Sequence, residues 1–381
     1  MDRRLRWLPS PRTGFFRVHQ FLGATVGAYW ILMAATGSVL LYGETLEQAV
    51  HPRWFAVKPE GAPAPLSQLL PAVAKRFPDT PVEDIRLPRH PTDSVMCLLP
   101  DPNGGPTREV YVHPRTGAIL GHRLESESWL LLAYRIHAEL LLGARGESLN
   151  GLLALAASAL LFTALPLWMP RNRAQWRQRF QVKTTGNRMR LLFDLHNAFG
   201  MSALPALATV AATGVYFLYA ARLEPAILAA TGTFAAPEHA LPTSASTALP
   251  VDRLRALAEA VEPQARTTWV NLPIAPEKPF RITRAHRGAE GLGHTSEISL
   301  DPGDGRVLGV TSARGEPIGR RVVRWMYPLH TASWGGTVAK LVYLASALAT
   351  IALAATGIAK WRLRSRRKLD AKLRRTGPPE A

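Results

Sequence analysis

The sequence repeats itself at long range, and each repeat joins a histidine to a long apolar stretch. The stretch around His19 aligns without gaps with the stretch around His196, and Thr36-Gly37 then meets Thr213-Gly214. The same alignment also superimposes Gly23 on Gly200, Tyr42 on Tyr219, and Leu46-Glu47 on Leu223-Glu224. A chain built in this way must fold as two similar halves.

A second pair of segments repeats in the same manner. His137 aligns with His330 without gaps. The matched positions around these two histidines are Tyr134 and Tyr327, Gly143 and Gly336, and Trp168 and Trp361. The chain is therefore an internal duplication, and histidine is among the few residues that both copies share.

Four apolar stretches, near 21–42, 149–169, 198–221 and 339–359, predict membrane-spanning helices. Each is about 20 residues long, which is enough to cross a bilayer. We expect each stretch to belong to a longer helix, with its histidine in or near the first membrane turns. No cleavable signal peptide precedes the first stretch, which we interpret as an uncleaved anchor.

The basic residues orient these helices. The net charge of the chain is +18, and all of it comes from three segments: 2–17, 170–190, and the tail from Lys360. By the positive-inside rule, both termini and the 170–190 loop are predicted to be cytoplasmic. Because the charge lies beside membrane spans, topology explains it better than nucleic-acid binding does.

The two segments left outside are repeats of one another. Residues 109–121 (EVYVHPRTGAILG) match 297–309 (EISLDPGDGRVLG), each a strand, a tight turn and a strand. Upstream, 66–78 and 251–263 each have the pattern of one amphipathic helix. The lone Cys97 can form no intrachain disulfide, so it is expected to be a structural thiol.

The predicted fold class is thus an α-helical membrane protein: a four-helix transmembrane bundle with an internal duplication and two periplasmic α+β domains. The segments are assigned as 1–42 (cytoplasmic N-terminus and first span), 43–130 (first periplasmic domain), 131–169 (second span), 170–190 (basic cytoplasmic loop), 191–222 (third span), 223–322 (second periplasmic domain), 323–361 (fourth span) and 362–381 (basic cytoplasmic tail).

Four histidines in register suggest axial ligands for haem. An imidazole at membrane depth is costly unless it has a partner, and paired imidazoles in a helix bundle can hold haem iron. The topology places His19 and His196 near the cytoplasmic leaflet and His137 and His330 near the periplasmic leaflet. Each pair is therefore predicted to hold one b-type haem.

Further side chains are candidates near these haems. Arg17 and Arg135 each lie two residues before a histidine and are candidate partners for haem propionates. Met326, one turn before His330, is an alternative axial ligand.

Other readings of the histidines stay open. They could be interfacial residues that reach towards headgroups, or ligands of a zinc or iron ion, although no Asp, Glu or Cys accompanies them as a ligand set. At the level of function, the alternatives are a non-enzymatic regulator or binding protein of the membrane, and a metal-ion transporter.

The heads of the spans, the Ala-Thr-Gly at 35–37 and 212–214, and the hairpin YVHPRTGAILG resemble the PepSY-associated transmembrane family over nearly the full length. Within it, the chain is most similar to inner-membrane ferric-siderophore reductases of the ferrioxamine type. The resemblance implies PepSY-like domains at 43–130 and 223–322, and haem-mediated electron transfer to ferric iron outside. The second hairpin departs from the pattern, with Asp-Gly for Thr-Gly, and 286–294 is a Gly-rich excursion.

The expected function is therefore that of an enzyme, a haem-dependent ferric-siderophore reductase that releases Fe(II) in the periplasm. Ferrous iron is bound less tightly by hard oxygen donors, so the chelator survives. The cytoplasmic segments are too short for a flavin or nicotinamide domain, and no G-x-G-x-x-G motif follows a strand. Electrons must then come from a quinol, a flavin or a reductase partner.

Overall fold

The computed structural model describes residues 11–59, 61–170, 172–185, 187–233, 241–242, 248–275, 277–286, 295–312 and 315–376. They form two compact units. The helical unit comprises the described residues within Met1–Leu41, Tyr134–Ala220 and Leu329–Ala381, and the α/β unit comprises those within Tyr42–Ala133 and Ala221–Pro328. Each unit draws on both halves of the duplication.

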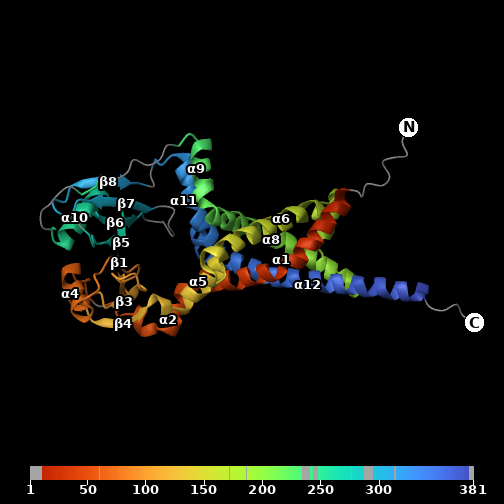
Figure 1. Cartoon of the computed structure of the whole chain (residues 1–381), viewed down its shortest axis with the longest axis horizontal. Coiled ribbons are helices and arrows are strands. Elements are labelled where there is room, and N and C mark those ends of the chain that lie inside the picture. The colour runs from red at the N-terminus through yellow and green to blue at the C-terminus, as the bar shows by residue number, and fades with distance from the viewer. Residues whose placement is uncertain are drawn as a thin grey trace, which may run out of the picture. The chain divides into compact units, whose positions relative to one another are not determined.

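Four long helices form the helical unit: α1 (Pro11–Leu41), α6 (Gly143–Trp168), α8 (Arg188–Leu218) and α12 (Gly336–Thr376). Helices α1 and α8 each pack against both α6 and α12 (Figure 1). All four are long and apolar enough to cross a membrane. Large apolar side chains such as Phe21, Leu152 and Val338 are exposed on them, as lipid-facing residues would be.

The second and fourth spans differ from the single helices that we expected. A short helix α5 (Trp129–Glu139) precedes α6, and α11 (Ile318–Thr331) precedes α12 with a 3₁₀ turn, η3 (Ser333–Gly335), between them. His137 and His330 lie on these short helices. The prediction of continuous helices is wrong because Leu140, Leu141 and Ala332 adopt positive φ, which a right-handed helix cannot contain. Gly143 and Gly336, also at positive φ, start the new helices.

An eight-stranded antiparallel sheet forms the centre of the α/β unit, in the order β4-β3-β2-β1-β5-β6-β7-β8. The two halves of the chain therefore share one sheet and are not independent domains. Its strands are β1 (Asp84–Arg86), β2 (Val95–Leu99), β3 (Arg108–Val112), β4 (Ile119–Leu124), β5 (Arg266–Asn271), β6 (Phe280–Ala285), β7 (Thr295–Leu300) and β8 (Val307–Thr311). Further short helical elements are α2 (Gly43–Val50), α3 (Pro52–Phe55), η1 (Glu125–Glu127), α7 (Arg173–Phe180) and α9 (Ala220–Ala230).

The two repeats meet where β1 pairs with β5. Ile85 lies opposite Val270 at the centre of this pairing, with Asp84 opposite Asn271. The Asp84 carboxylate accepts hydrogen bonds from the Asn271 amide and, at 3.3 Å, from the Trp269 indole N–H. These polar contacts hold the register of a strand pair that is only three residues long.

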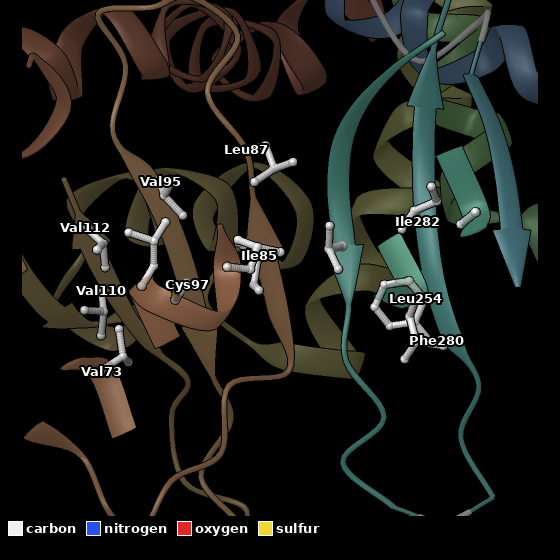
Figure 2. Close-up of a cluster of buried hydrophobic side chains, with 14 of the residues drawn as sticks. Val73, Ile85, Leu87, Val95, Cys97, Val110, Val112, Leu254, Phe280 and Ile282 are labelled. Carbon is white, nitrogen blue, oxygen red and sulfur yellow. The ribbon is translucent and has the colours of Figure 1, made fainter. Parts of the chain in front are cut away.

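One hydrophobic core joins both repeats beneath helices α4 (Leu66–Arg76) and α10 (Val251–Val261) (Figure 2). The Asp252 carboxylate of α10 accepts hydrogen bonds from the backbone N–H groups of Leu66 (2.9 Å) and Ser67 (3.0 Å) at the start of α4. Burial alone would raise the pKa of Asp252, but these hydrogen bonds outweigh it and lower the pKa. The ionised carboxylate thus ties the helices of the two repeats together.

Cys97 lies within this core, and burial raises the pKa of its thiol to about 12. It is a free, buried thiol, as predicted.

The two hairpin turns also agree with the sequence, because Gly117 and Gly305 both adopt positive φ at matching positions. The Asp-Gly of the second hairpin therefore preserves the turn. Most of the Gly-rich excursion, 287–294, lies outside the described residues.

Candidate functional site: two facing histidine pairs

His19 of α1 and His196 of α8 face one another within the helical unit. Their ring centroids are 6.4 Å apart and their planes are nearly perpendicular, at 88°. We call these two residues the first histidine pair. The duplication predicted this partnership, because both residues occupy the same position in the two repeats.

His137 of α5 and His330 of α11 form the second histidine pair. Their ring centroids are 6.1 Å apart, with an angle of 64° between the planes. His330 also contacts the ring of Phe217 edge-on, at 5.4 Å between centroids. The structure thus joins all four predicted histidines in the two predicted pairs.

A threonine holds Nδ1 of each of the four imidazoles. His137 Nδ1 lies 2.9 Å from Thr36 Oγ1, and His330 Nδ1 lies 2.9 Å from Thr213 Oγ1. In the first pair, the corresponding distances are 3.1 Å from His19 to Thr163 and 3.0 Å from His196 to Thr356.

These contacts bear on which ring nitrogen carries the proton. Thr36 and Thr213 each donate their single hydroxyl proton to a backbone carbonyl of their own helix, at 2.8 and 2.7 Å. With the hydroxyl proton placed there, the hydroxyl oxygens accept from Nδ1–H of the imidazole. His19 Nδ1 also lies 3.3 Å from the Leu160 carbonyl oxygen, which can only accept. The tautomer with the proton on Nδ1 satisfies these contacts and keeps the Nε2 lone pair available for a metal.

Small residues next to the threonines let the rings approach the helices. A Cβ atom at Gly37 would lie 3.2 Å from His137 Cε1, and one at Gly214 would lie 3.6 Å from His330 Cε1. Gly357, beside Thr356, has the same relation to His196, also at 3.6 Å. Each Thr-Gly dipeptide thus combines a hydrogen-bond acceptor with a small residue against which the imidazole edge packs.

The helices that carry the second histidine pair are anchored at their last carbonyls. The Asn150 side chain donates to the carbonyls of His137 and Ala138, each at 2.9 Å, and its own oxygen accepts from Tyr29. In the other half, Tyr343 donates to the Leu329 carbonyl at 2.6 Å. Asn150 and Tyr343 occupy equivalent positions in the duplication. They satisfy carbonyls that the break after each short helix leaves free.

The two pairs lie far apart along the bundle. Thr36 follows His19, and Thr213 follows His196, by 17 residues of continuous helix. At 1.5 Å per residue this is a rise of roughly 25 Å, close to the thickness of the hydrocarbon core. The pairs therefore lie towards opposite ends of the bundle.

The geometry of each pair fits the iron of a haem. An imidazole nitrogen lies about 2 Å from a metal that it binds, so rings on opposite sides of one metal ion have centroids about 6 Å apart. The observed separations are 6.4 and 6.1 Å. Zinc would need three or four protein ligands, and the described residues contain no cluster of three metal-ligating side chains. A haem needs only the two axial ligands, since the porphyrin supplies the others.

Comparison with known families agrees with the arrangement of helices. The sequence profile of the PepSY-associated TM region family matches residues 16–364. The chain belongs to this family. No curated protein matches the sequence. The family match extends over both histidine pairs and over the α/β unit, so this PepSY-associated membrane protein has its candidate site within the region that defines the family.

In this PepSY-associated protein, the two arginines that were predicted to bind propionates are exposed. Arg17 is exposed on α1, and Arg135 is exposed on α5, where its Nε lies 3.5 Å from the Glu139 carboxylate. Asp194 occupies the position that duplicates Arg17, and this buried acid pairs with Arg190. A role of Arg17 and Arg135 at propionates stays a prediction.

Proposed function

We propose that this membrane protein binds two b-type haems, one in each histidine pair, and carries electrons across the bilayer to ferric chelates. The observation that supports it most is that four imidazoles face one another in two pairs, which lie about 25 Å apart along the bundle. When bound, haem would supply reversible one-electron transfer. The chain supplies axial nitrogens, fixes their tautomer and sets the spacing.

The chain connectivity supports a direction for this transfer. The chain enters the α/β unit after α1 and α8 and returns to the helical unit within α5 and α11, and these helices carry the second histidine pair and its threonines. Basic segments flank the opposite ends of the spans. We infer that the second pair faces the periplasm in a bacterial inner membrane, with both termini in the cytoplasm.

The proposed acceptor is a ferric siderophore in the periplasm. One electron converts one Fe(III) to Fe(II), which hard oxygen donors such as hydroxamates bind less tightly. The donor on the other side is a quinol, a flavin or a reductase partner. None of these steps consumes the chelator, so it is released intact.

The unmodified protein tests this proposal directly. Protein purified from haem-replete cells should contain two b haems per chain in a pyridine haemochrome assay. After reduction with dithionite and removal of the excess, a ferric hydroxamate should reoxidise the protein, and Fe(II) should appear in a ferrozine trap. The gallium(III) hydroxamate, which cannot be reduced under these conditions, is the control. A haem content near zero would contradict the proposal, as would reduced haem that is stable to the ferric chelate.

The threonine contacts lead to a narrower prediction. Thr213→Val should raise the midpoint potential of the haem in the second histidine pair and weaken its retention about tenfold, because the His330 imidazole loses its hydrogen-bond acceptor and donates less strongly to oxidised iron. A redox titration followed in the α bands measures both haems separately. Thr213→Ser keeps the hydroxyl and should behave like the unmodified protein. Equal potentials in the Val and Ser variants would show that this contact does not tune the site.

A further inference from the structure

Two cations of α12 lie over aromatic rings beside the first histidine pair. Lys360 Nζ is 5.3 Å from the ring centroid of Phe193, and Arg364 Cζ is 5.0 Å from that of Phe16. Both cations are half-buried, and they lie one helical turn apart. Such cation–π contacts fix the position of a long side chain at low cost.

The two phenylalanines tie these cations to the site. Phe16 precedes His19 by three residues, and Phe193 precedes His196 by three, at matched positions of the duplication. Residues three apart share a face of a helix. The ammonium of Lys360, one turn beyond Thr356 on α12, acts electrostatically on both His19 and His196.

Neither cation has an acidic partner among the residues that the structure describes. Lys360 and Arg364 instead repel one another, because they lie close enough for their charges to interact. Asp194, which follows Phe193 in the chain, is bonded to Arg190 and to the backbone N–H of Lys183. Two like charges, half-buried at the end of a membrane helix, are costly unless an anion lies between them.

We propose that Lys360 and Arg364 bind the two propionate carboxylates of the haem in the first histidine pair. This inference rests on the proposed function, since it requires a haem there. A b haem carries both carboxylates on one edge, and two cations one turn apart beside the axial histidines provide one partner for each. Charge-assisted hydrogen bonds of this kind are strong and directional. For this haem, the pair takes the role that the sequence suggested for Arg17.

The chemistry also gives the cations an effect on electron transfer. A fixed positive charge near a haem disfavours the oxidised iron, which carries the greater charge. Lys360 and Arg364 should therefore raise the potential of the haem in the first histidine pair relative to a site without them. On α6, the position that matches Lys360 is occupied by Leu167, so Lys360 is not repeated in the other half of the chain.

The test compares two double variants that lose the same charge from the same helix. Lys360→Met with Arg364→Met should release the first-pair haem to apomyoglobin about tenfold faster and lower its midpoint potential, while the second-pair haem is unchanged. Arg366→Met with Arg367→Met removes two exposed cations and should leave both haems as they are. Lys360→Arg with Arg364→Lys keeps both charges and should retain most of the haem.

Each other outcome overturns a defined part of the proposal. If the unmodified protein holds no haem, the proposed function fails first. If it holds two haems and the Lys360/Arg364 variant matches it in haem release and potential, these cations do not bind propionates. Equal effects of the two Met variants would indicate a general charge effect instead. If the Lys360/Arg364 variant differs from the unmodified protein only in its binding of phosphatidylglycerol in nanodiscs, the cations bind lipid phosphate and the inference is wrong. Size-exclusion chromatography and circular dichroism confirm that each variant is folded.

Discussion

His196→Ala should yield a folded protein with one b haem instead of two. The imidazole of His196 lies opposite that of His19, with ring centroids 6.4 Å apart, and alanine leaves one face of the iron without a protein ligand. Bis-imidazole haem gives sharp reduced bands, so the loss should halve the pyridine haemochrome ratio and remove one component of the α band. The second histidine pair should keep its spectrum, because it lies roughly 25 Å away along the bundle.

Matched variants make this result specific. His19→Ala should remove the same haem as His196→Ala, since both side chains serve one iron. His90→Ala replaces an exposed histidine of the α/β unit and should leave two haems. The pairing would be wrong if either His19 or His196 could be replaced with the two-haem spectrum intact.

The duplication made much of this site predictable. A residue shared by two diverged halves is under the same local requirement in each, so the alignment of His19 with His196 and of His137 with His330 predicted both pairs. Hydropathy predicted the four spans, because a chain in lipid must satisfy the hydrogen bonds of its backbone groups within a long apolar helix.

The supporting residues were harder to predict. Thr36 and Thr213 stood in the repeated Ala-Thr-Gly motif, but threonine in a membrane helix usually bonds only its own backbone. Thr163 and Thr356 also occupy matched positions, each five residues before the matched tryptophans, and this repetition was a signal that the sequence offered. Their role depends on packing between helices, which no local pattern contains.

Two features of the fold follow from tertiary contacts alone. Non-glycine residues at positive φ, such as Leu140 and Ala332, carry no sequence signal, so the helix breaks after α5 and α11 could not be foreseen. The joining of two repeats through β1 and β5 depends on three residues from each strand. A strand pairing so short gives no indication of its partner in the sequence, and the shared sheet therefore emerges only in the structure.

His330→Ala should abolish the reduction of ferric siderophore while the first-pair haem stays reducible. In the proposed direction the haem of the second histidine pair meets the acceptor, because the chain continues into the α/β unit shortly after Thr36 and Thr213, which contact this pair. Without it, an electron on the first-pair haem faces a distance comparable with the whole hydrocarbon core, about 30 Å. We expect ferrozine-trapped Fe(II) to fall to the level seen without protein, although dithionite still reduces the remaining haem.

His196→Ala provides the opposite test of the same relay. It removes the first-pair haem, so the remaining haem should still be reoxidised by ferric hydroxamate after dithionite reduction. Electron delivery from a quinol pool or from the cytoplasmic face of a proteoliposome should stop, because the entry site is missing. The two variants thus separate the entry of electrons into the protein from their transfer to the acceptor. If His330→Ala protein reduced ferric siderophore at the normal rate, the acceptor would not depend on the second histidine pair, and the α/β unit would be better explained as a binding module.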